Sequence, residues 1–168
     1  MRINEEPTEG ANLQPVIRFL GWMTLAYSVS FAAYYGRGMG IWFWYISLRR
    51  PSWDLPTWAW TPVWTILFGF IGLSIWTVVN DPSGSKRTTA QWMQFVTLLL
   101  AGVSPWVYFA WHQLVVSLVV TGLLLASSVV TSVVCWKVKP AAGQLLIPVV
   151  GWLLYSGALE FTVWHLNR

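Results

Sequence analysis

Charged side chains are scarce in this chain. Lys, Arg, Asp and Glu together supply 10% of its 168 residues, whereas soluble domains carry about a quarter. Hydrophobic residues supply 56%, which excludes both intrinsic disorder and an ordinary water-soluble domain. The composition therefore predicts an integral membrane protein in contact with the lipid bilayer.

The patterns that mark most redox, metal and hydrolytic sites are also missing. The one cysteine, Cys135, lies within an apolar run, so neither an internal disulfide nor a CxxC motif can form. No GxSxG, HExxH or Walker phosphate loop occurs, which argues against a conventional hydrolase, nucleotide-using enzyme or pump. His112 and His165 lack carboxylate partners, so we expect interfacial packing there rather than ligation of a chlorophyll magnesium or a haem iron, and we predict no metal site.

Basic residues outnumber acidic ones and give a net charge of +4. They form short clusters beside apolar runs, as interfacial anchors do, so no nucleic-acid partner is expected. Residues 1–15 include Glu5, Glu6 and Glu9 but no apolar run. We therefore expect a polar tail there rather than a cleaved signal.

Five long runs are almost free of charge. Each can cross a hydrocarbon core of roughly 30 Å, which needs about 20 helical residues. They lack the alternation of membrane strands, so we expect an all-α membrane protein, a five-transmembrane-helix bundle. A single domain over 16–168 would hold the spans 18–36, 61–80, 90–111, 113–136 and 143–164, with a long ordered lid loop over 37–60 between the first two.

With five spans, the two termini lie on opposite faces of the membrane. Six basic residues fall on the N-terminal side and four on the other, which favours a cytoplasmic N-terminus. Nine of the 14 tryptophans lie toward the C-terminal side and four toward the other. Interfacial belts are roughly balanced, so this excess indicates a role beyond anchoring.

Three strings in the sequence share a pattern with one known family. They are Trp44-Tyr45-x-x-Leu48-x-Arg50-Pro51-Ser52-Trp53-x-x-Pro56-x-Trp58-x-x-x-Pro62-Val63-Trp64-Thr65-x-Leu67-Phe68, Pro148-x-x-x-Trp152 with Leu159-x-Phe161-x-x-Trp164-x-x-Asn167, and Ser104-Pro105-x-x-Tyr108-Phe109. The first two resemble the signature of the tryptophan-rich sensory protein / translocator protein family, or peripheral benzodiazepine receptor family. The third is similar, more weakly, to the Trp-Ser/Pro-Pro-x-Phe-Phe segment of that family's third helix.

The resemblance implies a five-helix bundle, often a homodimer, in which the first loop caps a pocket. Similar proteins bind porphyrins such as protoporphyrin IX and synthetic benzodiazepine-type or isoquinoline ligands, and some bind cholesterol. They are described as sensors, regulators or transporters, and a slow porphyrin-degrading activity is attributed to certain bacterial members.

We expect an aromatic pocket for a tetrapyrrole or a similar flat apolar ligand. Trp64 and Phe68 share one face of the second span with Trp60, and such a face suits a planar macrocycle, although plain helix packing is the alternative explanation. Pro105 should kink the third span beside the pocket. The expected ligand-binding residues are Trp44, Trp53, Trp60, Trp64, Phe68, Trp106, Tyr108, Trp152, Tyr155 and Glu160.

Glu160 is the one acidic residue well inside a predicted span, where a charge is costly unless it pairs or faces a cavity. A salt bridge to Arg37, Arg49 or Arg50 would tie the lid to the fifth span. A carboxylate that reaches interfacial water is the alternative.

The chain departs from the family pattern in three places. Two asparagines typical of the family are missing, one near Leu100 and one at Glu160, which puts porphyrin affinity in doubt. The cholesterol pattern needs a tyrosine where this chain has Phe161, so cholesterol binding is not expected. That difference also favours a bacterial source and a bacterial inner or intracytoplasmic membrane.

Two functions of different classes follow. The first is a membrane protein that binds a porphyrin-type ligand and acts as a sensor, regulator or transporter. The alternative is a structural or assembly subunit packed against a larger pigment–protein complex, such as a photosynthetic reaction centre with its light-harvesting ring, in contact with (bacterio)chlorophyll or carotenoid. Porphyrin breakdown through oxidation at Trp64 and the lid tryptophans is a third, weaker alternative.

Overall fold

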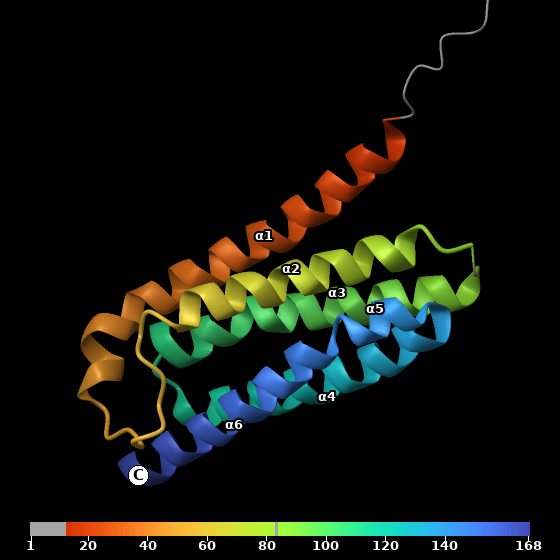
Figure 1. Ribbon diagram of the computed structural model, residues 1–168. Helices are drawn as coiled ribbons and strands as arrows, with labels where there is room; N and C mark the ends of the chain where they lie inside the picture. Colours follow the sequence, from red (N-terminus) through yellow and green to blue (C-terminus); the bar gives the residue numbers. More distant parts are fainter. Residues whose placement is uncertain (1–12, 83) are drawn as a thin grey trace, which may run out of the picture.

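The computed structural model describes residues 13–82 and 84–168, and these residues form helices and connecting loops without a strand (Figure 1). Most of the expected polar tail, residues 1–12, lies outside the described residues. The helices are α1 (Gln14–Gly40), η1 (Ile41–Tyr45), α2 (Trp60–Val79), α3 (Ser85–Pro105), η2 (Trp106–Ala110), α4 (Leu114–Val138), α5 (Pro140–Gln144) and α6 (Ile147–Asn167), of which η1 and η2 are π-helical turns.

Five segments are long and apolar enough to cross a membrane, which confirms the expected five-helix fold. The segments α1 with η1, α2, α3 with η2, and α4 supply the first four, and α5 with α6 supplies the fifth. They run up and down, so the loop between η1 and α2 lies at the same end of the bundle as the C-terminus (Figure 1). The α2–α3 and α4–α5 connections lie at the other end.

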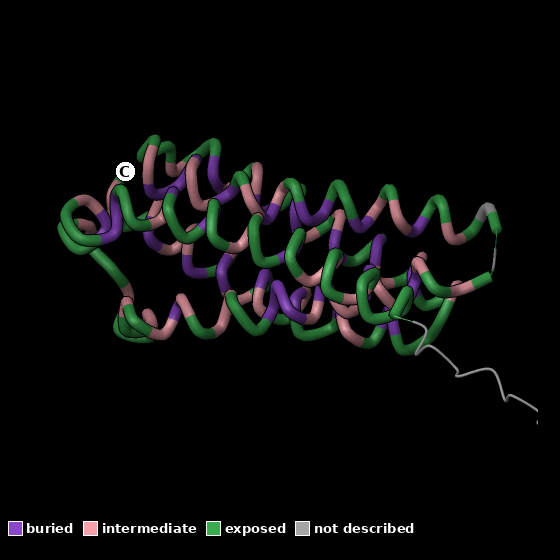
Figure 2. The backbone as a smooth tube through the Cα atoms, turned by 90° about the horizontal axis from the view of Figure 1, so that it is seen from above, coloured by how far each residue is buried: buried purple, intermediate pink, exposed green. Residues whose placement is uncertain are grey.

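The spans are packed in a ring. Helix α1 contacts α2 and α3, α3 contacts α4, and α4 contacts α5 and α6, which in turn contact α2. Buried residues face the inside of this ring, while its outer surface is exposed, as expected for helices surrounded by lipid (Figure 2). Helix α1 is the least buried of the five spans and diverges from α2 toward its N-terminal end (Figure 1).

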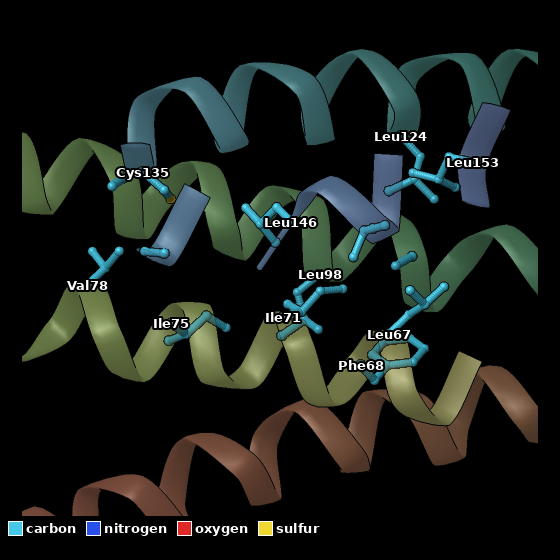
Figure 3. Packing of buried hydrophobic residues seen from close by; sticks show 14 of the residues in the cluster. Leu67, Phe68, Ile71, Ile75, Val78, Leu98, Leu124, Cys135, Leu146 and Leu153 are labelled. Carbon is cyan, nitrogen blue, oxygen red and sulfur yellow. The ribbon is translucent and has the colours of Figure 1, made fainter. Parts of the chain in front are cut away.

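Helix α2 supplies the centre of the core. Its buried side chains recur at three- and four-residue intervals, which places them along one face, where they meet leucines of α3, α4 and the fifth span (Figure 3). The buried residues of α2 shown there are Leu67, Phe68, Ile71, Ile75 and Val78. Small hydroxyl and amide groups join the helices within the core: Gln94 Nε2 donates to Ser74 Oγ (2.8 Å), which donates to the Ala142 carbonyl (2.8 Å). Interhelical hydrogen bonds of this kind satisfy polar groups that lipid cannot.

The helix ends differ from those expected from the sequence. The first helix was expected to end at Gly36, before Arg37, but helical structure continues to Tyr45, so the lid loop is shorter than 37–60. Arg37 therefore lies within the helix, and its side chain donates to the Thr57 carbonyl of the lid and to Thr61 Oγ1 of α2. At Pro105 the α-helical ladder of α3 ends, and the chain goes on as the π-helical turn η2.

Candidate functional site

A cavity lies at the lid end of the bundle, enclosed by α1, α2, α3 with η2, α4 and α6. Its volume is only about 60 Å³, so its walls are close together. The cavity is lined by Ser30, Ala33, Tyr34, Arg37, Trp60, Thr61, Trp64, Thr65, Phe68, Ser104, Pro105, Tyr108, Phe109, Thr121, Leu153, Ser156 and Glu160.

One wall of the cavity is a cluster of aromatic rings on α2 and α6. Trp64 lies 5.7 Å from Phe68 between ring centroids, and Trp152 meets Trp60 at 5.4 Å and Trp64 at 6.4 Å in edge-to-face geometry. Edge-to-face pairs at this distance add to the energy of apolar burial. Because Trp152 packs behind Trp60 and Trp64, it holds their rings in place.

Another part of the cavity wall comes from η2, which packs against η1. Tyr108 and Phe109 of η2 contact Tyr45 of η1 at 5.9 and 5.4 Å, and Tyr108 also meets Trp44 at 5.5 Å. The turns approach closely at Gly40, where a Cβ atom would lie 1.8 Å from the Phe109 carbonyl oxygen. A residue without a side chain is therefore required at this contact.

The lid is fastened to the end of α6. The Arg49 N–H donates to Asn167 Oδ1 (3.0 Å), and Asn167 Nδ2 donates to the Arg49 carbonyl (2.9 Å). Tyr155 donates from its hydroxyl to the Trp53 carbonyl (3.2 Å), and the two rings meet at 5.7 Å. The fastening therefore joins both ends of the segment 49–53 to one helix.

Asp54 holds the lid together from within. Its Oδ2 accepts hydrogen bonds from the Tyr45 hydroxyl (3.0 Å) and Arg50 Nη1 (2.9 Å), and the Arg50 guanidinium lies over the Tyr45 ring. Arg50–Asp54 is the one ion pair among residues 13–82 and 84–168. This arrangement connects η1 to the lid proper.

Arg37 lies at the mouth of the cavity. Its guanidinium donates to the Thr57 carbonyl (3.4 Å) and to Thr61 Oγ1, and it lies 5.5 Å from the centroid of the Tyr34 ring. It therefore bridges the end of α1, the lid and the start of α2, and it places a positive charge on the cavity wall.

Glu160 places a carboxylate on the same cavity from α6. The Ser117 hydroxyl donates to Oε2 (2.8 Å), and the Thr121 hydroxyl is shared between both carboxylate oxygens at 3.0 Å. Ser117 and Thr121 are four residues apart, on one face of α4. The carboxylate is thus fixed by hydroxyl groups in a wall that is otherwise largely apolar.

The expected salt bridge between Glu160 and a lid arginine does not form. Arg37 binds Thr57 and Thr61, and Arg50 pairs with Asp54 in the described residues. The alternative, a carboxylate turned to interfacial water, also differs from the structure, because hydroxyl groups of α4 hold Glu160 against the cavity.

The structure separates the ten expected site residues into three groups. Trp60, Trp64, Phe68, Tyr108 and Glu160 line the cavity. A second group contacts lining or lid residues without lining the cavity itself: Trp44, Trp53, Trp152 and Tyr155. Trp106 points away and donates from its indole N–H to the Ala32 carbonyl (3.1 Å) between η2 and α1.

Several lining residues fell outside the set expected from the sequence. Helix α1 contributes a complete face, Ser30, Ala33, Tyr34 and Arg37, at three- and four-residue spacing. Ser156 precedes Glu160 by one turn on α6. Polar residues repeated at four-residue spacing within an apolar span were the signal that could have located the walls formed by α4 and α6. His112 stacks on Trp44 at 4.5 Å, and His165 lies beside Phe161.

The fold and its cavity define a class: polytopic α-helical membrane proteins with an aromatic cavity at the same end of the bundle as the first loop. Comparison with known proteins then shows the family. The model of the TspO/MBR family matches residues 19–165, so the chain belongs to that family.

Relatives carry the names used within this family. The chain is 31% identical over 126 residues to Protein CrtK of Rhodobacter capsulatus, covering 74% of this chain and 78% of the relative. It is 30% identical over 127 residues to the translocator protein of Homo sapiens, covering 74% and 75%. It is 30% identical over 125 residues to the tryptophan-rich protein TspO of Chlorobaculum tepidum, covering 73% and 78%.

Proposed function

We propose that this protein binds a porphyrin-type tetrapyrrole, or a similar flat apolar ligand, in the lidded cavity and thereby acts in sensing, regulation or transport. The observation that supports this most directly is the aromatic lining of the cavity, with Trp60, Trp64 and Phe68 from α2 and with Tyr108 and Phe109 from η2. Flat ligands gain affinity from apolar burial and ring stacking against such a lining.

The cavity's dimensions require movement for a macrocycle to enter. Ligand pockets span about 300–1,000 Å³, and the cavity as it stands is much narrower than that. Only about 60 Å³ is open to the centre of a water molecule, so the walls must separate before a macrocycle fits. The lid, held by a few hydrogen bonds to α6, is the element that would open.

A titration with protoporphyrin IX tests this function. We expect quenching of tryptophan fluorescence in the purified, detergent-solubilised protein, and Trp64→Ala should weaken binding by about tenfold because one stacking face is lost. The matched control is Trp92→Ala, because Trp92 is 63% exposed and lies outside the cavity. A folded protein that shows no quenching, or equal affinities in both variants, would exclude this site.

A second candidate function is that of an assembly subunit in a pigment–protein membrane complex. It is favoured by α1, whose large side chains stay exposed along its length, among them Leu20, Phe31 and Tyr35. Purification from the native membrane in mild detergent tests it. Co-migration with pigment proteins supports an assembly role, whereas migration alone or as a homodimer excludes it.

The proposed location is a bacterial inner or intracytoplasmic membrane. The chain is an integral membrane protein of a family with bacterial relatives, including the protein of Chlorobaculum tepidum. Fractionation of the source cells, followed by immunodetection of the protein in each membrane, tests the location.

A further inference from the structure

Glu160 is a carboxylate on the cavity wall without a protein cation to neutralise it. The described residues hold one ion pair, Arg50–Asp54, and Glu160 takes part in none. A charge removed from water is costly unless it is paired or fully hydrogen-bonded. The hydroxyl groups of Ser117 and Thr121 supply one hydrogen each. A carboxylate accepts about four hydrogen bonds, so acceptor capacity remains on the cavity side.

A second polar group of the cavity also lacks a partner. Ser156 lies one turn before Glu160 on α6, lines the cavity and is 4% exposed. Its hydroxyl oxygen makes no hydrogen bond to the described protein. Buried hydroxyl groups are normally satisfied, so an orphaned one beside a carboxylate indicates a place for a polar ligand group.

The positively charged group on the cavity wall, the Arg37 guanidinium, is bound by groups other than Glu160. Arg37 is engaged at the mouth by Thr57, Thr61 and the Tyr34 ring. Glu160 is instead held by the Ser117 and Thr121 hydroxyl groups of α4. The two charges therefore belong to different walls, and a ligand meets a carboxylate on one and a guanidinium on the other.

We propose that the cavity selects a flat aromatic ligand carrying a protonated nitrogen, which is placed against Glu160 and Ser156. This rests on the proposed function, because the flat part of the ligand must occupy the aromatic walls. A protonated nitrogen supplies both the positive charge that Glu160 lacks and the donors for its free lone pairs. A carboxylate on the ligand would be repelled from this wall and is compatible only with the Arg37 end.

Three probes that share one ring system and differ in charge test the proposal: 1-pyrenemethylammonium, 1-pyrenemethanol and 1-pyrenecarboxylate. Binding is followed by energy transfer from tryptophan to pyrene, with the protein in phosphatidylcholine nanodiscs and empty nanodiscs as the partition blank. We expect the ammonium probe to bind about tenfold more tightly than the alcohol, and the carboxylate probe to bind most weakly.

The variant Glu160→Gln keeps the shape and the acceptor oxygen but removes the charge. It should abolish the preference for the ammonium probe while leaving the alcohol within about twofold of the wild type. Glu160→Asp should keep the preference. Binding of the alcohol shows that each variant retains its cavity, and the order of the three probes on the wild type tests the proposal even if a variant does not fold.

The outcomes separate the two proposals. If none of the three probes binds the wild-type protein, the aromatic ligand site fails and this inference fails with it. If the alcohol binds but the ammonium probe binds no more tightly, or if Glu160→Gln leaves their ratio unchanged, the aromatic site stands and selection by Glu160 is overturned.

Discussion

Gly40 lies where the two π-helical turns meet, and its lack of a side chain sets their distance. A Cβ atom there would come within 1.8 Å of the Phe109 carbonyl oxygen. The obstacle is backbone, so no rotamer change can relieve it. The wall that carries Tyr108 and Phe109 is thus positioned by a residue that does not touch the cavity.

Gly40→Ala should therefore lower thermal stability, with a cost of about 1–3 kcal/mol or more from overpacking. The matched control is Gly38→Ala, because Gly38 lies on the same helix with open space where its Cβ would be. That control should be neutral or slightly stabilising, since alanine is the better helix former. Unfolding of both variants in the same detergent gives the comparison, and equal melting temperatures would contradict it.

At the residue scale, the sequence indicates which side chains are unusual but not what they contact. The position of Glu160 in an apolar span marked it as costly, yet the expected arginine partner was wrong because Ser117 and Thr121 reach it first from α4. Trp106 shows the same limit: its indole is directed to Ala32 by the rotation of a π-helical turn, which sequence spacing alone does not predict.

At the scale of elements, the lid is held to α6 at both ends of segment 49–53. The reciprocal hydrogen bonds of Asn167 with the Arg49 backbone close one end, and the contact of Tyr155 with Trp53 holds the other. Each hydrogen bond contributes only about 1 kcal/mol. The lid can therefore open locally without unfolding the bundle.

Asn167→Ala should loosen the lid while leaving the bundle folded. We expect amide hydrogen exchange in segment 49–53 to accelerate by about tenfold, because two hydrogen bonds are lost. The control is Asn80→Ala, since Asn80 donates to the Trp76 carbonyl at the other end of the bundle. Exchange is measured by mass spectrometry on the protein in detergent. Unchanged amide exchange of the lid in Asn167→Ala would show that the hydrogen bonds of Asn167 do not hold the lid closed.

The π-helical turn η2 brings Tyr108 and Phe109 to the cavity. Hydropathy cannot reveal such a turn, because its composition matches that of the surrounding helix.

At the scale of the whole molecule, the first span, α1 with η1, separates the lid from the start of α1. The lid and the C-terminus share one end of the bundle, and the α2–α3 connection lies at the other (Figure 1). The excess of basic residues at the N-terminal end predicts, under the positive-inside rule, that this end lies in the cytoplasm. The lid then opens to the opposite side of the membrane.

Labelling with a membrane-impermeant maleimide tests this orientation. Trp58→Cys, on an exposed part of the lid, should react in intact cells or spheroplasts, whereas Pro82→Cys in the α2–α3 connection should react only after permeabilisation. The native Cys135 is fully buried and should stay unlabelled, so it need not be removed. The reverse labelling pattern would invert the orientation.

The global architecture was predictable because it depends on sums over many residues. Five runs of low charge predict five spans, and the long connection between the first two predicts a loop at one end, although η1 makes that loop shorter than expected. The packing order of the spans and the arginine contacts depend on single hydrogen bonds and small side chains instead. At Arg37 the helix continues past a charge that hydropathy treats as a boundary.

The crossed rings of Trp60, Trp64 and Trp152 also have an optical consequence. The ring centroid of Trp152 lies 5.4 Å from that of Trp60, with the planes at 76°, and 6.4 Å from that of Trp64, with the planes at 87°. Indoles this close share electronic excitation, and a fixed crossed arrangement splits it into circular dichroism bands of opposite sign. The protein thus carries an unlabelled spectroscopic signature beside its own cavity, which should change when a ligand binds against Trp60 and Trp64.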